Sequence, residues 1–259
     1  MKSMKRMMVA VVVLAAFLGQ AEESAKPAAG KPPIKVSVLG DSYSTFDGKN
    51  SPNQAPWYPN PTCGVTEVEQ TWWMQVITRL GATLLVNDAW GGSTVSTTGY
   101  DGADYTDRAF FTRATRLGEN PDLILICGGT NDDWAGAPLG KDKWKDWTAE
   151  DLKSLRPALA KTLATVQEKY PKAKILFVVN GVLRKEVKGA LRAVCSHYKV
   201  KSVEVRNLED KLKMNHPTPD GMKVIANAVM NTLKSMGFKE IKQKPAPKAA
   251  KKDTKKEKE

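Results

Sequence analysis

Ser42 is the residue around which the other candidate catalytic side chains can be arranged. It follows an apolar run and the pair Gly40-Asp41, so its hydroxyl is expected at the end of a strand. Serine becomes a strong nucleophile only when a base takes its proton and donors stabilise the oxyanion that forms. The sequence holds two histidines: His197 falls within an expected surface helix, and His216 lies in a loop before the last expected helix. His216 is therefore the candidate base.

Two further segments can supply hydrogen-bond donors to an oxyanion. Gly91 and Gly92 follow a second apolar run, and glycine lets the backbone approach a ligand closely and present an N–H group. Asn131 follows a third run and offers a side-chain amide. We therefore expect an oxyanion hole made by the backbone N–H groups of Ser42 and Gly92 and by the amide of Asn131.

These segments resemble, in the same order, the sequence blocks of the SGNH/GDSL hydrolase family. The matching stretches are Gly40-Asp41-Ser42, Asn87 to Thr94, Gly129 to Asp132, and His216-Pro217 with Gly221-Met222. The resemblance covers residues 34–236 and implies a serine esterase in which Ser42 attacks, His216 is the base and no cofactor is needed. It also assigns the oxyanion role to Gly92 rather than Gly91. Further stretches are similar to a gut-bacterial, secreted subgroup of the family.

One position departs from the family pattern. The family usually carries an aspartate three residues before its histidine, and Lys213 stands there. A lysine cannot accept a hydrogen bond, so it cannot orient the imidazole of His216. Three arrangements remain open: Asp210 or Glu209 reaches His216 through a loop of different shape, a backbone carbonyl replaces the carboxylate in a Ser–His dyad, or the site is degenerate. Among these we take Asp210 as the third member of a catalytic triad.

Five strand-like runs alternate with helical segments and must position these residues. The runs cover 34–39, 84–89, 122–127, 174–180 and 201–206. Most are continuously apolar, as in strands buried on both faces of a parallel sheet, whereas the last alternates and is expected at an edge. Helical periodicity is expected over 71–79, 148–166, 183–198 and 219–236. This order predicts a three-layer α/β/α sandwich, flavodoxin-like, around a parallel sheet of about five strands.

The two ends of the chain differ in composition from its middle. Residues 1–21 combine basic residues, a short apolar run and small residues, which predict a cleavable signal peptide and export to the periplasm or the extracellular space. We expect a linker over 22–33, the hydrolase domain over 34–238 and a disordered Lys-rich tail over 239–259. Of the net charge of +12, three positive charges fall in the signal peptide and a net five in the tail. No nucleic-acid partner is therefore expected, and weak contact of the tail with an anionic envelope stays open.

The cysteines are odd in number: Cys63, Cys127 and Cys195. Cys127 lies within an apolar run and is expected to be buried, whereas a disulfide between Cys63 and Cys195 is left open. Histidines and cysteines show no spacing typical of a metal site. The oligomeric state is not specified by any of these patterns.

The predicted reaction is hydrolysis of a carboxylic ester through an acyl-enzyme. Trp90 and Trp134 stand beside the oxyanion segments and would stack on a sugar face. The expected substrate is therefore a small ester or a glycan ester, in the first place an O-acetyl group on a carbohydrate. Two alternatives stay open: a lipid or thioester hydrolase with the same machinery, which would need an apolar acyl channel, and a non-catalytic glycan-binding module, which Lys213 favours.

Overall fold

The computed structural model describes residues 32–241, and its compact unit begins at Pro33. The predicted signal peptide, the linker before residue 32 and the tail from residue 242 lie outside these residues. The described structure continues past the predicted domain end at residue 238 as far as residue 241. Ile241 donates its N–H to the carbonyl of Arg79, and the carboxylate of Glu240 pairs with Arg79 and Lys234.

A parallel five-stranded sheet forms the centre of the molecule, as predicted. Its strands are β1 (Lys35–Gly40), β2 (Thr83–Ala89), β3 (Leu123–Cys127), β4 (Lys174–Asn180) and β5 (Lys201–Val205). They lie in the order β2-β1-β3-β4-β5, so the alternating last run does form an edge strand. The chain passes from β1 to β2 on one side and then to β3 on the other. Ligands bind at such a reversal of strand order in open α/β sheets.

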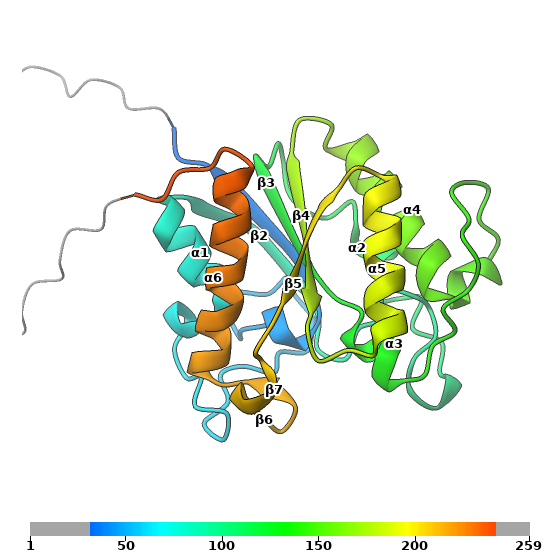
Figure 1. Cartoon of the computed structure of the whole chain (residues 1–259), viewed down its shortest axis with the longest axis horizontal. Coiled ribbons are helices and arrows are strands. Elements are labelled where there is room, and N and C mark those ends of the chain that lie inside the picture. The colour runs from blue at the N-terminus through cyan, green and yellow to red at the C-terminus, as the bar shows by residue number, and fades with distance from the viewer. Residues whose placement is uncertain (1–31, 242–259) are drawn as a thin grey trace, which may run out of the picture. The chain divides into compact units, whose positions relative to one another are not determined.

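Helices cover both faces of the sheet, which gives the predicted three layers (Figure 1). On one face lie α1 (Trp72–Leu80) and α6 (Pro219–Ser235). On the other face lie α2 (Phe110–Arg113), α4 (Leu155–Lys169) and α5 (Lys185–His197). A short helix, α3 (Thr130–Trp134), starts directly after β3. Single 3-10 turns occur at Ser42–Ser44, Val68–Gln70, Tyr100–Gly102, Asp151–Lys153 and Glu209–Lys211.

Alternation along the strands divides the buried side chains into two cores. In β3, Ile124 and Ile126 pack under α4 and α5, whereas Leu123 and Leu125 pack under α1 and α6. Successive side chains of a strand point to opposite faces, so a strand that is buried throughout serves both cores. The continuous apolar run of the sequence is the direct consequence of this double burial.

The described structure decides between free cysteines and the disulfide that the sequence left open. All three are free and buried. Cys195 belongs to the core under α4 and α5, and Cys63 belongs to the core on the opposite face. The sheet therefore separates the two cysteines, and the disulfide between them does not form.

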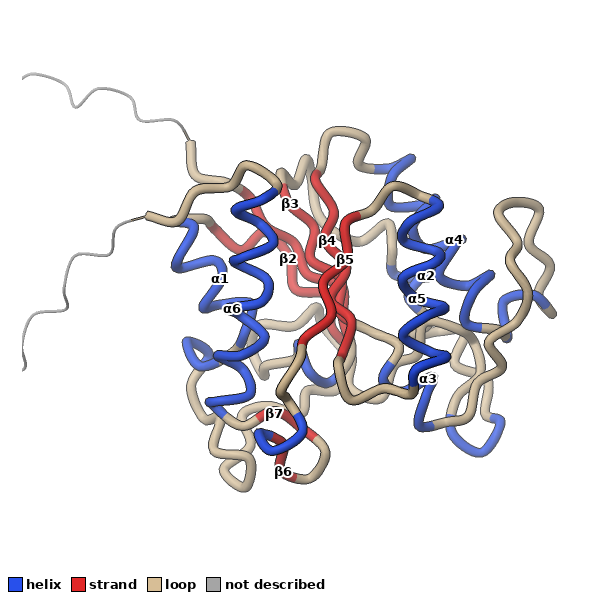
Figure 2. Tube along the Cα trace, in the orientation of Figure 1, coloured by secondary structure: helices blue, strands red, loops and turns tan. Residues whose placement is uncertain are grey.

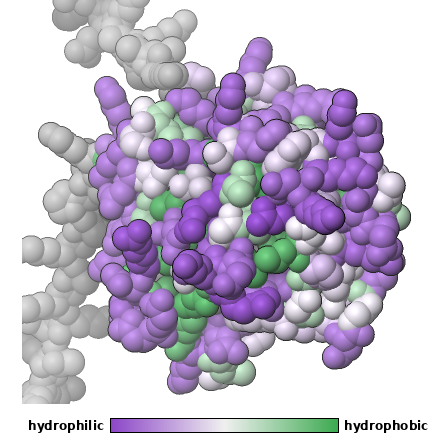
Figure 3. All heavy atoms as spheres, turned by 45° about the vertical axis from the view of Figure 1, so that its right-hand side comes forward, coloured by the Kyte–Doolittle hydropathy of each residue, from purple (hydrophilic) through white to green (hydrophobic). Residues whose placement is uncertain are grey.

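Short elements were absent from the sequence prediction. A two-stranded antiparallel hairpin, β6 (Leu212–Lys213) and β7 (His216–Pro217), carries the candidate base. Strands of two residues produce too little periodicity to be recognised from a sequence. On the face shown in Figure 3, hydrophilic side chains predominate and hydrophobic ones form small separate patches. Within residues 32–241, no helix combines the length and the apolar character that crossing a membrane requires.

Candidate active site

The candidate catalytic residues meet at the edge of the sheet where the strands end. Gly40 of β1 is in register with Ala89 of β2 and Cys127 of β3, so the segments that follow these strands begin side by side. The hairpin β6–β7 lies at this edge, which is the lower one in Figure 2. Ser42, Gly92 and Asn131 come from the three strand ends, and the hairpin adds His216.

The turn after β1 is built to hold Ser42 in place. Its 3-10 helix is capped by Asp41, whose carboxylate accepts the N–H of Tyr43 at 3.0 Å. Gly40 is required because a Cβ there would lie 2.6 Å from Oγ of Ser44. Asp41 is fully buried, and burial raises the pKa of its carboxyl to about 7. Asp41 therefore has a structural role in the turn beside the nucleophile.

Ser42 and His216 form the hydrogen bond on which the site depends. Oγ of Ser42 lies 2.8 Å from Nε2 of His216. Nδ1 of His216 lies 2.9 Å from the carbonyl oxygen of Met214. A carbonyl only accepts, so Nδ1 carries the ring proton and Nε2 is free to accept the proton of Ser42. This is the tautomer that a general base needs.

The structure corrects the prediction that Asp210 is the third member of a triad. Within the described residues, His216 bonds to Met214 and Ser42, and no carboxylate takes part. The side chain of Asp210 is 76% exposed and pairs with Lys211. Glu209 is exposed as well. Of the three arrangements left open, the observed one is a dyad oriented by a backbone carbonyl.

The conformation of the hairpin explains why a carbonyl takes the place of the acid. Lys213 pairs with His216 across the hairpin, so only Met214 and Asn215 form the turn. Both have positive φ, 51° and 60°, as a type I′ turn requires. In this tight turn the carbonyl of Met214 faces the ring of His216. Residue 213 belongs to the opposite strand of the hairpin, and the group that faces Nδ1 of His216 is the carbonyl of Met214.

Neighbouring side chains hold this hairpin at three points. The hydroxyl of Tyr43 donates to the carbonyl of Asn215 at 2.7 Å, and the hydroxyl of Tyr58 donates to that of Pro217 at 2.8 Å. Sγ of Cys63 lies 3.2 Å from the carbonyl oxygen of Lys213. These bonds flank His216 on both sides and compensate for the unfavourable backbone of the turn.

Two backbone N–H groups are available to an oxyanion beside Ser42. Gly91 donates its N–H to the carbonyl of Ala55, whereas the N–H groups of Gly92 and Ser42 have no acceptor among the described residues. Gly92 has a φ of 75°, a conformation that glycine adopts without strain. Of the two glycines, the one whose N–H has no acceptor among the described residues is thus Gly92, to which the family resemblance assigned the oxyanion role.

Asn131 completes the group of donors, and its amide is oriented from both ends. Nδ2 donates to the carbonyl of Ser93 at 2.8 Å, and Oδ1 accepts the hydroxyl of Tyr100 at 2.7 Å. One N–H of the amide remains for an oxyanion. Tyr100 was not recognised from the sequence, and the only available signal was its place in a long loop.

Comparisons with known proteins agree with this geometry. The model of the GDSL-like lipase/acylhydrolase family matches residues 34–233. The chain belongs to this family. Its members are carboxylic ester hydrolases, and the resemblance seen in the sequence is thereby confirmed.

Two solved structures of GDSL-like lipases are similar over almost their whole length. The one from Bacteroides ovatus is 39% identical with a TM-score of 0.75, covering 79% of this chain and 100% of its own. The one from Bacteroides uniformis is 42% identical with a TM-score of 0.75, covering 78% and 96%. An acetyl xylan esterase from the rumen bacterium Butyrivibrio proteoclasticus shares the fold at 16% identity and a TM-score of 0.57, covering 79% and 65%. Among curated proteins, no match was found.

Aromatic rings enclose the imidazole of this GDSL-like hydrolase. Trp57 is stacked on His216, with centroids 3.8 Å apart and an interplanar angle of 11°. Trp134 meets the ring edge-on at 6.0 Å and is 39% exposed. Tyr43 and Tyr58 lie at 5.4 Å and 6.4 Å. His216 is 6% exposed, and this burial lowers the pKa of its imidazole below the usual 6.5.

Arg113 is a buried positioning residue of the GDSL-like hydrolase that sequence reasoning missed. It donates to the carbonyl of Gly40 at 3.2 Å and to Oγ of Ser93 at 3.0 Å, and it pairs with Asp88 at 3.6 Å. It thus connects the end of β1, the end of β2 and the segment after Gly92. Burial lowers the pKa of its guanidinium to about 10. The signal in the sequence was an arginine within the apolar stretch 109–114.

Asp132 stabilises the same segment from the side of α3. Its carboxylate accepts the N–H groups of Val95 and Ser96 at 2.7 and 2.9 Å and the hydroxyl of Ser96 at 2.7 Å. Trp90, the other predicted aromatic contact, is half-buried, and the guanidinium of Arg108 lies 5.1 Å from its ring. Among residues 32–241, no three His, Cys, Asp or Glu side chains could hold a metal ion.

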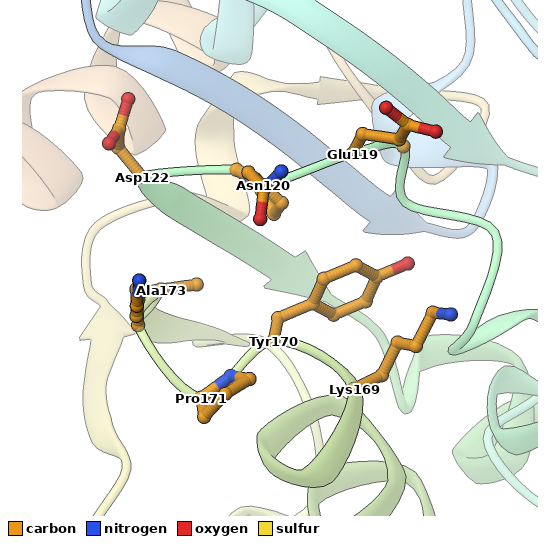
Figure 4. A pocket seen from close by; sticks show the side chains of 10 residues that line it. Glu119, Asn120, Asp122, Lys169, Tyr170, Pro171 and Ala173 are labelled. Carbon is orange, nitrogen blue, oxygen red and sulfur yellow. The ribbon is translucent and has the colours of Figure 1, made fainter.

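A separate cavity of about 320 Å³ lies at the opposite edge of the sheet. The segments 118–122 and 169–173, which precede β3 and β4, line it (Figure 4). The hydroxyl of Tyr170 is already bonded to Thr115 and Leu117. None of the candidate catalytic residues lines this cavity, so the chemistry belongs to the other edge.

Proposed function

We propose that this enzyme cleaves esters through a Ser42–His216 dyad and an acyl-enzyme. The observation that carries the proposal is the bond between Oγ of Ser42 and Nε2 of His216, combined with the proton that Met214 holds on Nδ1. Nucleophile, base and orienting acceptor are therefore already aligned. No cofactor enters the reaction.

The proposed reaction has two halves. The proton of Ser42 passes to Nε2 of His216 while Oγ attacks the ester carbonyl carbon. The resulting oxyanion accepts hydrogen bonds from the N–H groups of Ser42 and Gly92 and from the amide of Asn131. His216 then gives its proton to the leaving alcohol, and the acyl group stays on Ser42. Water attacks the acyl-enzyme by the same route and releases the acid.

For the substrate we propose an acetyl ester of a carbohydrate. The supporting features are aromatic: Trp134 is partly exposed beside His216, and Tyr100, which bonds to Asn131, packs on Tyr105 with centroids 6.5 Å apart. Exposed aromatic faces suit the apolar face of a sugar ring. Asp101 and Asp104, which are exposed in the same loop, give this rim a polar character. A distant fold relative is named an acetyl xylan esterase.

The decisive test compares the wild type with Ser42→Ala on aryl esters of acetate, butyrate and octanoate. We expect the variant to lose roughly a thousandfold or more in kcat, since the nucleophile is removed. We also expect the wild type to prefer acetate and to release acetate from acetylated xylan. Equal rates for the two proteins would leave only a glycan-binding role. A preference for octanoate would support a lipid hydrolase instead.

We further propose that the enzyme acts outside the cytoplasm, since a polymeric glycan ester would be met there. Export depends on residues 1–21, and we expect cleavage before Glu22. Amino-terminal sequencing of the protein recovered from the periplasm or the medium tests this. An unprocessed chain that stays in the cytoplasm would contradict it.

A further inference from the structure

The dyad lacks the negative charge that a triad provides. Met214 fixes the tautomer of His216, but it does so with an uncharged carbonyl oxygen. Hydrogen bonds to ionised groups are roughly twice as strong as neutral ones. When Ser42 gives up its proton, His216 becomes a cation that is 6% exposed and has no carboxylate bonded to it in the described structure. Some other feature must stabilise that cation.

Trp57 is placed to do so. Its ring lies parallel to the imidazole at a centroid distance of 3.8 Å, which is well within the range of a cation–π interaction. Tryptophan has the strongest such attraction among the aromatic side chains. A parallel stack also restricts rotation of the imidazole out of the plane in which Nε2 meets Ser42.

The position of Trp57 is tied to the nucleophile itself. Its backbone N–H donates to Oγ1 of Thr45 at 2.8 Å, and that hydroxyl donates to the carbonyl of Ser42 at 3.0 Å. The next residue, Tyr58, accepts the N–H of Asp47 with its carbonyl at 2.7 Å. Through Thr45, the backbone of Trp57 is therefore connected to the backbone of Ser42.

Among the described residues, the other ionisable groups on the elements around His216 do not supply the missing charge. They lie on the turn after β1, the loop before α1, the hairpin and α3, and they are Asp41, Tyr43, Tyr58, Cys63, Lys213 and Asp133. Burial raises the pKa values of Tyr43 and Tyr58, so both stay neutral. Asp41 bonds to the backbone of its own turn, and Asp133 pairs with Arg184. Lys213 is exposed, and the thiol of Cys63 contacts a carbonyl.

We propose that Trp57 is a positioning residue for His216. The indole face of Trp57 fixes the plane of the imidazole ring and stabilises the imidazolium in place of the usual carboxylate. The inference rests on the proposed function of the Ser42–His216 pair. It predicts that the pKa of His216 depends on the aromatic face at position 57. The pKa should fall in the order tryptophan, phenylalanine, leucine.

The test is an NMR titration of the histidine Cε1–H signals in the wild type, Trp57→Phe and Trp57→Leu. The chain has two histidines, so His216→Gln assigns both signals and His197 serves as an internal reference. We expect the pKa of His216 to drop by roughly 0.5 to 1 in Trp57→Leu and by less in Trp57→Phe. An unchanged pKa of His216 in Trp57→Leu would overturn the proposal. A rise would overturn it as well, and would mean that the indole only excludes water.

Kinetics provide the second readout. We expect kcat to fall roughly 3- to 30-fold in Trp57→Leu, with KM little changed and with partial rescue in Trp57→Phe. Trp144→Leu is the matched control, because it removes a similar stack from His197. An effect on KM alone, or an equal loss in the control, would contradict the proposal. If Ser42→Ala shows no loss of activity, the proposed function fails, whereas the titration still decides whether Trp57 stabilises the cation.

Discussion

Both histidines of this chain are stacked on a tryptophan, and only one of them is placed to do chemistry. Trp57 lies on His216 at 3.8 Å and 11°, and Trp144 lies on His197 at 3.7 Å and 6°. His197 is exposed at the end of α5, whereas His216 is buried with a serine hydroxyl at 2.8 Å. Stacking alone therefore does not identify a site. Burial and the partners of the two ring nitrogens make the difference.

The largest effect should come from removing each histidine in turn. His216→Ala is expected to lower kcat/KM by roughly a thousandfold or more, because His216 is the side chain that bonds to Oγ of Ser42 in the described structure. His197→Ala should leave kcat/KM unchanged within the error of the assay. Steady-state kinetics on an aryl acetate measure both. Comparable losses in the two variants would show that His216 and His197 do not differ in their contribution to the reaction.

The proposed oxyanion donors belong to the site that contains His216. Asn131→Ala is expected to lower kcat by roughly 10²- to 10³-fold, as the loss of one oxyanion donor does in other hydrolases. The control is Asn231→Ala on the exposed surface of α6. The same kinetic assay is used for both. A normal kcat in Asn131→Ala would remove this residue from the site.

Burial should also be visible in the pH dependence. The pKa of His216 is lowered below 6.5 by burial, and the base acts only when neutral. The acid limb of kcat/KM should therefore have its midpoint below pH 6.5, with activity retained above it. Asp41→Asn must be measured as well, because burial raises the pKa of Asp41 to about 7. A midpoint at or above 6.5 in both proteins would contradict the assignment.

The smallest effect is expected at Asp210. Its side chain is exposed and bound to Lys211, so Asp210→Asn should change kcat/KM by less than about twofold, in the range of a surface ion pair. Glu209→Gln provides a matched acid from the same 3-10 turn. A large loss in Asp210→Asn alone would support Asp210 as the third member of a triad and would contradict the proposed role of Trp57.

Much of the site could be predicted because its parts are local. Glycine, aspartate and asparagine directly after apolar runs mark strand ends, and parallel strands bring those ends to one edge. The strand ends that precede Ser42, Gly92 and Asn131 are in register, and Asn131 bonds to Ser93, the residue after Gly92. Tyr100 and Arg113 could not be found in this way. Their contacts with Asn131 and with the end of β1 span 31 and 73 positions of the sequence.

The succession of strands and helices along the chain, the candidate nucleophile and the candidate base could all be inferred from the sequence, because periodicity and residue chemistry are local properties. The orientation of His216, in contrast, follows from the tertiary structure. A tight hairpin with positive φ at Met214 and Asn215 turns a carbonyl to Nδ1, and a distant loop lays Trp57 on the ring. The first depends on the backbone conformation of a two-residue turn. The second depends on packing between residues 57 and 216, which are far apart in the sequence. Neither is encoded in a local pattern of residue types. Lys213 showed that the acid was missing, and the fold showed what stands in its place.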